Sequence, residues 1–383
     1  MRPTLMLLLL LLTGCTREVP NTGQAPVDDT PVIGREGAAP AWPASLPARV
    51  NGLALAPDGG VYAVGPRYAA RLSPDGDMLW SVPLTLEARA VAATATGIVV
   101  VGEEYRPGRL YEVSVALLSQ DTGAVLAART FGGLMHDWAT SVAVTGDGAI
   151  YVGGITSSVD FPVTLAAWRR YAPGYGSTGF VARLSPDLVL VAATYLGVRP
   201  SAAYGLAISP AGDAVVVGST GSRYFPTTEG AYQRAASLYS NGWALRLTAG
   251  LESLVWSTYL GWSGPDEPRA CAVSLDGSVW VGGSTQSASF PGAPFGGWDA
   301  FRLKLSSDGR SASQFSRYGG ADEDRGYAVA ADGVVAGRLG SAGFYATAPA
   351  GAAVTVPGVR VMAVAGRYWA GTGADGTGIV GVR

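Results

Sequence analysis

The sequence predicts an all-β fold, a seven-bladed β-propeller of four-stranded antiparallel blades. Two segments, 151–197 and 215–261, are near copies that share an apolar run with glycine, a Phe-Pro pair and a Thr-Tyr-Leu-Gly ending. Self-similarity at a period of roughly 40 to 50 residues or somewhat more is typical of stacked β units that cannot bury their hydrophobic faces alone. The chain also has 54 glycines and 24 prolines, which suit many short strands joined by turns.

Seven places share an apolar run, a tight turn, a second apolar run and a glycine, which together predict seven β-hairpins. The closing glycines are Gly65, Gly102, Gly153, Gly218, Gly282, Gly337 and Gly371. Each first run also carries a small residue, which we expect to face the crowded axis of a radial array. These residues are Ala54, Ala92, Ala143, Ala207, Ala272, Ala328 and Ala363. The first runs are apolar on both faces, as expected for strands covered on both sides.

Two further strands follow the hairpin in the better-kept units. The third strands include Phe180–Leu184, Trp243–Leu247 and Phe301–Leu305, and turns rich in Pro, Asp and Gly lead into the fourth strands. Four antiparallel strands repeated seven times describe the propeller. The last unit is one strand short, so we expect the segment near Ala44–Val50 to supply its outer strand and to remove an exposed edge.

The N-terminus is predicted to be an export signal. Arg2 precedes the apolar stretch Leu5–Leu12, which is too short to span a bilayer. The ending Leu-Thr-Gly-Cys at 12–15 resembles the bacterial lipobox, which implies that Cys15 is acylated and anchors the protein to a membrane. The alternative is an ordinary secretory signal with a chance cysteine. We therefore divide the chain into a lipoprotein signal peptide (1–14), a Pro-rich tether (15–43) and the propeller (44–383).

Residues 137–320 resemble the bacterial beta-propeller repeat family, often called SBBP repeats. The resemblance rests on the apolar hairpins, the Phe-Pro pairs at 161–162, 225–226 and 290–291, and the Tyr-Leu-Gly endings. The flanking units keep the hairpin but lack Phe-Pro and the Tyr-Leu-Gly ending. The resemblance implies an exported or surface protein and no defined reaction.

Conventional catalytic sets are incomplete in this sequence. His136 is the single histidine, and we interpret it as a loop residue before a hairpin. Cys271 occupies a position that is apolar in the other units, so we interpret it as a core hydrophobe. The Asp-Gly turns lack the alternating oxygen ligands and distal Glu of a calcium loop. We therefore predict no catalytic residue, no metal and no cofactor. A net charge of −2 offers no basic footprint for nucleic acid.

The loops at one end of the propeller are the candidate ligand face. Connectors from second to third strands share an end with those between blades, and two of them, 156–179 and 220–242, are long. The candidate residues are Trp168, Tyr171, Tyr175, Tyr232, Tyr239 and His136. Packing of these rings onto their own blades is an equal alternative, and it is favoured for Phe161, Phe225 and Phe290. Acidic residues at the same end are expected to solubilise it: Asp137, Asp266, Glu267, Asp322, Glu323 and Asp324.

These observations predict a lipid-anchored extracytoplasmic propeller that binds or scaffolds a protein or polysaccharide at the cell envelope. Thr16, rather than Asp, follows the predicted lipidated cysteine, which under the sorting rule implied by the lipobox places the protein at the outer membrane. One alternative is a propeller hydrolase or lyase with a carboxylate pair at the axis. Another is an envelope assembly factor, because Ser119–Gly123 is similar to the repeat of quinone-dependent propellers and of an outer-membrane assembly lipoprotein.

Overall fold

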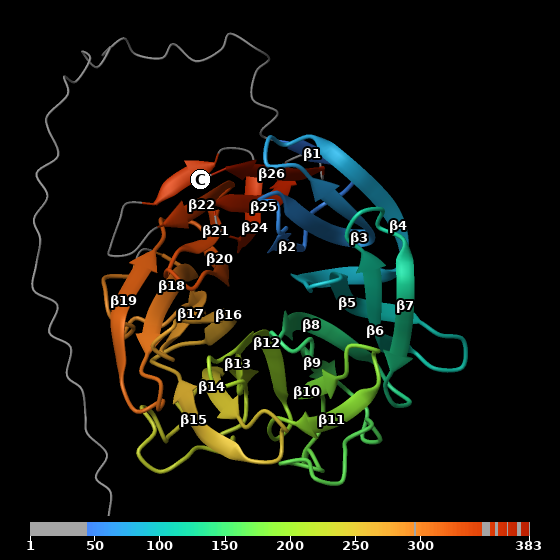
Figure 1. Cartoon of the computed structure of the whole chain (residues 1–383). Helices are drawn as coiled ribbons and strands as arrows, with labels where there is room; N and C mark the ends of the chain where they lie inside the picture. Colours follow the sequence, from blue (N-terminus) through green and yellow to red (C-terminus); the bar gives the residue numbers. More distant parts are fainter. Residues whose placement is uncertain are drawn as a thin grey trace, which may run out of the picture. The chain divides into compact units, whose positions relative to one another are not determined.

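Strands arranged around a central axis form a β-propeller in the computed structural model (Figure 1). The structure describes residues 44–294, 296–346, 353–356, 359–365, 367–373 and 377–382. Contacts divide the chain into two units, Met1–Ala39 and Pro40–Arg383, and the described residues belong to the second. The predicted signal peptide, the tether and Cys15 lie outside the described residues. Within the described ranges, no helix is long and apolar enough to cross a bilayer.

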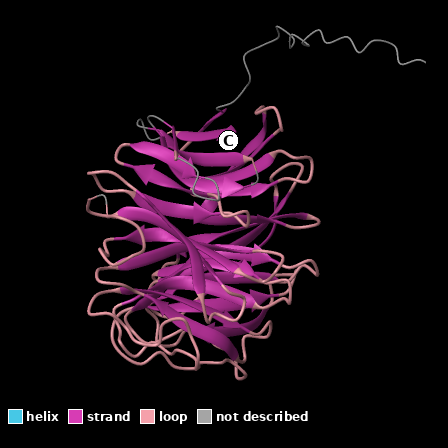
Figure 2. Ribbon diagram, turned by 90° about the vertical axis from the view of Figure 1, so that its left-hand side faces the viewer, coloured by secondary structure: helices cyan, strands magenta, loops and turns pink. Residues whose placement is uncertain are grey.

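The strands form six antiparallel sheets, and Figure 2 shows them stacked side by side with loops at their ends. Four sheets pair consecutive strands. They are β8 (Asp137–Val144), β9 (Ile150–Thr156), β10 (Thr178–Leu184) and β11 (Leu190–Tyr195); β12 (Ser201–Ile208), β13 (Ala214–Thr220), β14 (Asn241–Leu247) and β15 (Leu254–Leu260); β16 (Asp266–Val273), β17 (Val279–Thr285), β18 (Asp299–Leu305) and β19 (Ala312–Tyr318); and β20 (Arg325–Val329), β21 (Val335–Leu339), β22 (Ala342–Ala346) and β23 (Val354–Val356).

The other two sheets include the N-terminal strands. One has four strands, β24 (Val359–Ala365), β25 (Tyr368–Gly373), β26 (Gly378–Val382) and β1 (Ala44–Leu46). The other has six, β2 (Gly52–Leu55), β3 (Val61–Leu72), β4 (Met78–Ala93), β5 (Gly97–Tyr105), β6 (Tyr111–Ser119) and β7 (Val125–Phe131).

The predicted seven-bladed β-propeller of four-stranded blades is wrong, because the described strands form six sheets, one of which has six strands. The first two predicted blades merge into this sheet. In the first unit the second and third strands were expected to be separate, but β3 runs unbroken for 12 residues. β4, of 16 residues, runs from the end of the first unit into the first strand of the second. No long connector and no Phe-Pro pair interrupts them. The ladder therefore continues from one predicted unit into the next.

All seven predicted hairpins are present as antiparallel pairs: β2–β3, β4–β5, β8–β9, β12–β13, β16–β17, β20–β21 and β24–β25. The second strand of a hairpin needs a glycine where its backbone comes close to a carbonyl group of the first strand. A Cβ at Gly102 would overlap the carbonyl oxygen of Glu87, and a Cβ at Gly218 would overlap that of Ala202. In the third hairpin Gly154, next to the predicted Gly153, has the corresponding contact with the carbonyl of Trp138.

The predicted closure of the ring is confirmed. β1 pairs with β26 in the register Ala44↔Val380, Ser45↔Ile379 and Leu46↔Gly378, so the start of the propeller supplies the outer strand of its last sheet. Ala44 and Leu46 are buried in a cluster with Val61, Tyr368 and Val380. The first and last strands of the propeller therefore share one hydrophobic core.

Apolar side chains fill the spaces between neighbouring sheets. One cluster joins Val99 and Val113 of the six-stranded sheet to Val152 and Phe180 of the next sheet, all fully buried. The strand β9 is buried at each of its positions. This packing on both faces explains why the strands are not alternately polar, and it makes a rigid base for the loops at either end.

Candidate functional site

A channel runs along the axis, and seven inner segments line it. These segments are 51–53, 89–91, 140–142, 204–206, 269–271, 327–329 and 362–364. The six-stranded sheet contributes the first two and each other sheet contributes one. At the end where second strands lead to third strands, here named the connector end, the channel opens into a cavity of about 500 Å³. We name the residues that the channel and this cavity share the mouth ring: Asn51, Arg89, Thr140, Tyr204, Arg269, Tyr327 and Met362.

β-Bulges place the mouth ring. In six inner strands the pairing register shifts at the ring residue, and the shifts lie at Arg89, Thr140, Tyr204, Arg269, Tyr327 and Met362. A bulge leaves one residue unpaired and re-aims its side chain. A repeated irregularity of the backbone thus gathers polar and aromatic side chains at one end of the axis.

The small residues at the axis are not the ones predicted. The position after the ring residue is small in each segment: Gly52, Ala90, Ser141, Gly205, Ala270, Ala328 and Ala363. Only Ala328 and Ala363 were among the predicted alanines. A Cβ on Gly205 would lie 2.8 Å from Cα of Ala270, so neighbouring inner strands leave no room there for a larger side chain. In the first five units the predicted alanine lies two residues further along the same strand than the residue at the axis.

The two arginines of the mouth ring form ion pairs with glutamates that lie outside the ring. Arg89 forms two hydrogen bonds of 2.6 Å with Glu103, and these bonds raise the pKa of Arg89. Arg269 donates to Glu267 over 2.6 Å, and its guanidinium lies 4.4 Å from the ring centroid of Tyr204. The two arginines are therefore held in fixed positions at the mouth.

No carboxylate lines the channel or its mouth among the residues that the structure describes. Glu103 and Glu267, which lie behind the ring, form ion pairs with Arg89 and Arg269. Groups of three or more His, Cys, Asp or Glu side chains that could hold a metal ion are also absent from the described part of the chain. Cys271 lines the channel wall and packs against the core, and burial raises the pKa of its thiol to about 12. A neutral thiol is a weak nucleophile.

Two of the predicted ligand-face residues instead pack their connectors onto the fold. Trp168 is half-buried, and its backbone N–H donates to the carbonyl of Leu251 in the next sheet over 2.9 Å. Tyr232 has the same role in the next connector. It is half-buried, and its backbone N–H donates to the carbonyl of Gly309 over 3.0 Å. The same connectors hydrogen-bond to the outer strands β11 and β15 and so cover those edges.

The remaining predicted residues lie at the surface of the connector end but in different loops. Tyr171 and Tyr175 are 76% and 96% exposed, and Tyr239, in the next long connector, is 55% exposed. His136 is half-buried and stacks on Tyr111 with ring centroids 5.7 Å apart. Packing is confirmed for Phe161, Phe225 and Phe290, which are 3%, 3% and 1% exposed. The mouth ring lies at the same end of the propeller as these loops, and none of its residues was among the predicted ones.

Three acidic residues expected to solubilise the connector end are buried. Asp137, Asp266 and Asp324 are 0%, 0% and 1% exposed. Each accepts a hydrogen bond from a backbone N–H four residues earlier, namely those of Gly133, Trp262 and Gly320 over 2.7, 2.8 and 2.6 Å. These carboxylates fix the connectors that lead from one sheet into the next inner strand. Asp322 and Glu323 are exposed, as expected.

Asp266 makes stability depend on pH. Burial raises its pKa from 3.8 to about 6, against opposing hydrogen bonds from Thr285 and the N–H of Trp262. The folded state therefore binds this proton more tightly than the unfolded state, so its contribution is present below about pH 4 and is lost as pH rises through 6. We expect the stability advantage of wild type over Asp266→Asn to shrink by up to about 3 kcal/mol between about pH 4 and 7 in urea unfolding. Parallel pH profiles for the two proteins would contradict this assignment.

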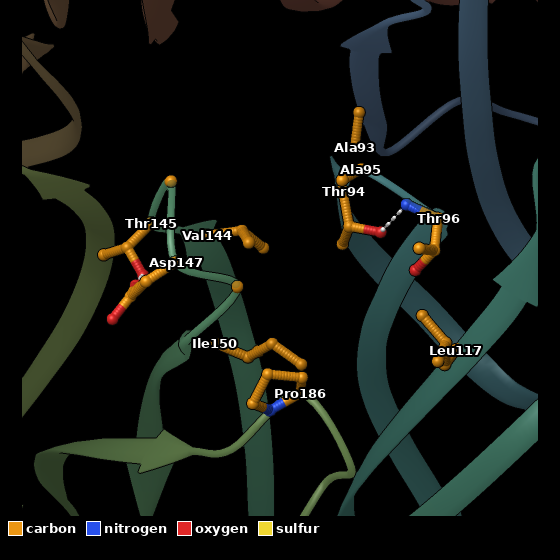
Figure 3. A pocket seen from close by; sticks show the side chains of 12 residues that line it. Ala93, Thr94, Ala95, Thr96, Leu117, Val144, Thr145, Asp147, Ile150 and Pro186 are labelled. Carbon is orange, nitrogen blue, oxygen red and sulfur yellow. Dashed lines mark hydrogen bonds between the residues drawn. The ribbon is translucent and has the colours of Figure 1, made fainter.

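A second cavity, of about 520 Å³, lies at the opposite end between the six-stranded sheet and the sheet of β8–β11 (Figure 3). Its threonine hydroxyls form hydrogen bonds within their own turns. Thr94 Oγ1 accepts from the N–H of Thr96 over 3.2 Å, and the Thr145 hydroxyl bonds to Asp147. The remaining lining is largely apolar, so this cavity offers few polar groups to a ligand.

No protein-family model matches the chain, and no curated protein is similar to it. The resemblance to bacterial beta-propeller repeats therefore stays a prediction. Among solved structures, BamB from Moraxella catarrhalis is 10% identical with a TM-score of 0.45. The match covers 86% of this chain and 84% of the BamB chain. A gluconolactonase from Xanthomonas campestris is 15% identical with a TM-score of 0.44, covering 88% and 86%. A luciferin-regenerating enzyme is 13% identical with a TM-score of 0.44, covering 88% and 91%. Similarities at these identities and TM-scores are no evidence for a function of this chain.

Proposed function

We propose that this chain is a lipid-anchored extracytoplasmic binding module at the outer membrane whose ligand is held at the channel mouth. The mouth ring carries the proposal. Six bulges, each at the same register of an inner strand, present Arg, Tyr, Thr and Met side chains to one cavity of about 500 Å³. This volume lies within the roughly 300–1,000 Å³ range of small-molecule sites, and rigid scaffolds with convergent polar groups are typical of such sites.

Binding is favoured over catalysis by the chemistry of the mouth. Arg89 and Arg269 are fixed by Glu103 and Glu267, so these glutamates are committed to ion pairs. General acid and base catalysis most often uses a histidine or a carboxylate, and the described lining of this cavity has neither. Asn51, Thr140 and Tyr327 instead offer amide and hydroxyl groups suited to holding a polar ligand.

The test uses four full-length proteins expressed in the cell envelope of a bacterium that exports and lipidates them. Wild type is compared with Cys15→Ser, with a mouth variant (Tyr204→Ala and Tyr327→Ala) and with a connector variant (Tyr171→Ala and Tyr175→Ala). Membrane and soluble fractions are separated, and envelope glycans and proteins recovered with each purified protein are quantified.

We expect Cys15→Ser to move from the membrane fraction to the soluble fraction, because the anchor is lost. The mouth variant should stay in the membrane and recover about 10-fold less ligand, whereas the connector variant should recover as much as wild type. Equal recovery by the mouth variant would refute the site. A Cys15→Ser protein that remains in the membrane fraction would refute the anchor.

A further inference from the structure

A further cavity, of about 490 Å³, lies beside the mouth ring and is here named the arginine pocket. It is lined by Arg49, Asn51, Arg338, Ser341, Val359, Arg360, Met362, Thr372 and Gly373. These residues come from the segment before β2, from β21 and the turn after it, and from β24 and β25 (Figure 1). The strands β2, β21, β24 and β25 are neighbours where the ring closes. Asn51 and Met362 also belong to the mouth ring, so the two cavities are neighbours at the connector end.

Three arginines, Arg49, Arg338 and Arg360, line this pocket. None of its described lining residues is acidic. Arg49 and Arg360 are exposed and form no ion pair with the described part of the chain. Arg338 is half-buried, and it donates through Nη2 to the carbonyl of Glu323 over 3.3 Å. Its Nε is buried and has no hydrogen-bond partner among the described residues. The pocket thus holds a buried donor and positive charge that nothing described there neutralises.

The acidic residues nearest to Arg338 are directed to other partners. Asp324 accepts from the N–H groups of Gly320 and Gly340, both over 2.6 Å. The carboxylate of Glu323 lies 3.7 Å from Arg325, with which it forms a solvent-exposed pair. Asp322 is exposed beside Gly340. None of the described lining residues carries a carboxylate, so the three guanidinium groups of the pocket favour an anion.

We propose that the arginine pocket binds the carboxylate of an acidic glycan whose neighbouring sugar units reach the mouth ring. This inference rests on the proposed binding function and names its ligand class. Guanidinium groups match the planar carboxylate as bidentate donors. Ser341, Thr372 and Asn51 add hydroxyl and amide groups for sugar hydroxyls, and the rings of Tyr204 and Tyr327 stand at the adjoining mouth.

An acidic peptide fits the same charge less well. Protein partners are held mainly by apolar and aromatic anchors that fill buried pockets. The described lining of the arginine pocket has only Val359 and Met362 as apolar side chains, and its other side chains are polar or charged. The lining therefore favours a ligand that forms hydrogen bonds around its whole perimeter, as a sugar does.

The test is calorimetric titration of the full-length protein in detergent at low salt with three probes. They are tetragalacturonate, the neutral maltotetraose and the acidic peptide tetraglutamate. The variant Arg49→Gln with Arg360→Gln removes the two exposed charges, and a second variant, Arg338→Gln, removes the half-buried one. Arg310→Gln is the matched control, because Arg310 is 67% exposed at a turn remote from the pocket.

We expect tetragalacturonate to bind at least about 10-fold more tightly than maltotetraose, and the Arg49/Arg360 variant to weaken its binding about 30-fold or more. Arg338→Gln should weaken it as well, while Arg310→Gln stays within about two-fold of wild type. Equal affinity for maltotetraose with no loss in the variants overturns the charged site, although envelope capture at the mouth could still succeed. Binding of tetraglutamate but not tetragalacturonate overturns the glycan assignment. Failure of all three probes overturns the inference, and the proposed function is then judged by the envelope capture.

Discussion

Deletion of residues 41–46 is expected to lower the thermal unfolding midpoint by about 6 °C. The deletion removes β1, whose three residues pair with β26. It also removes Leu46, which is 4% exposed and packs in a cluster with Val61, Tyr368 and Val380. Loss of a buried leucine, a small alanine contact and an edge ladder amounts to about 4 kcal/mol. For a domain of this size that free energy corresponds to several degrees, and scanning calorimetry measures it.

The matched control for this deletion is Ser45→Ala. Ser45 lies in the same strand but is exposed, so its substitution should change the midpoint by less than about 1 °C. The deletion variant should also self-associate in size-exclusion chromatography, because β26 becomes an open edge strand. A deletion variant that unfolds at the wild-type temperature would show that the ring does not depend on β1 for closure.

The hairpins and the closure were predictable because they rest on local signals. A turn with Asp-Gly or glycine between apolar runs specifies a hairpin regardless of the rest of the chain. The closure followed from a count, since the last unit offered three strands where the better-kept units have four. The burial of Phe161 and Phe225 was predictable in the same way, because a large apolar side chain recurring at one register implies one packing site.

The number of sheets was not predictable, because it depends on whether a ladder is interrupted. Gly65 was predicted to close the first hairpin, with a further strand after it. In the structure Pro66 still pairs opposite Glu87, and Arg67 takes a φ of 59°, so the strand kinks and continues. Proline at a bulge is compatible with a sheet, and tertiary packing decides whether the pairing resumes.

The mouth ring was missed for a related reason. Side chains alternate along a regular strand, so a residue is assigned to a face by its position relative to its neighbours. One bulge reverses this alternation, and sequence alone did not show where Arg89, Tyr204 or Arg269 would leave the ladder. The available signal was the glycine in the second strand, whose absent Cβ makes room for the bulged strand, as at Gly102, where a Cβ would overlap the carbonyl oxygen of Glu87.

Replacement of Arg317 by Met is expected to destabilise the protein by about 3–5 kcal/mol, because it leaves a buried carboxylate without its cation. Arg317 in β19 and Asp299 in β18 have side chains that are 2% and 0% exposed. Nε and Nη2 of Arg317 lie 2.6 and 2.5 Å from Oδ2 of Asp299, and Nη1 donates to the carbonyl of Ser287 over 2.9 Å. Urea unfolding at pH 7 measures the loss.

Two further variants separate charge from packing. Arg310→Met removes an exposed arginine that lies 3.9 Å from Asp308, and it should cost less than about 1 kcal/mol because solvent screens that pair. Arg317→Met combined with Asp299→Asn removes both buried charges and should recover a substantial part of the stability lost by the single variant. If the double variant is no more stable than Arg317→Met, the loss comes from packing and from the bond to Ser287, and the buried charge is not its cause.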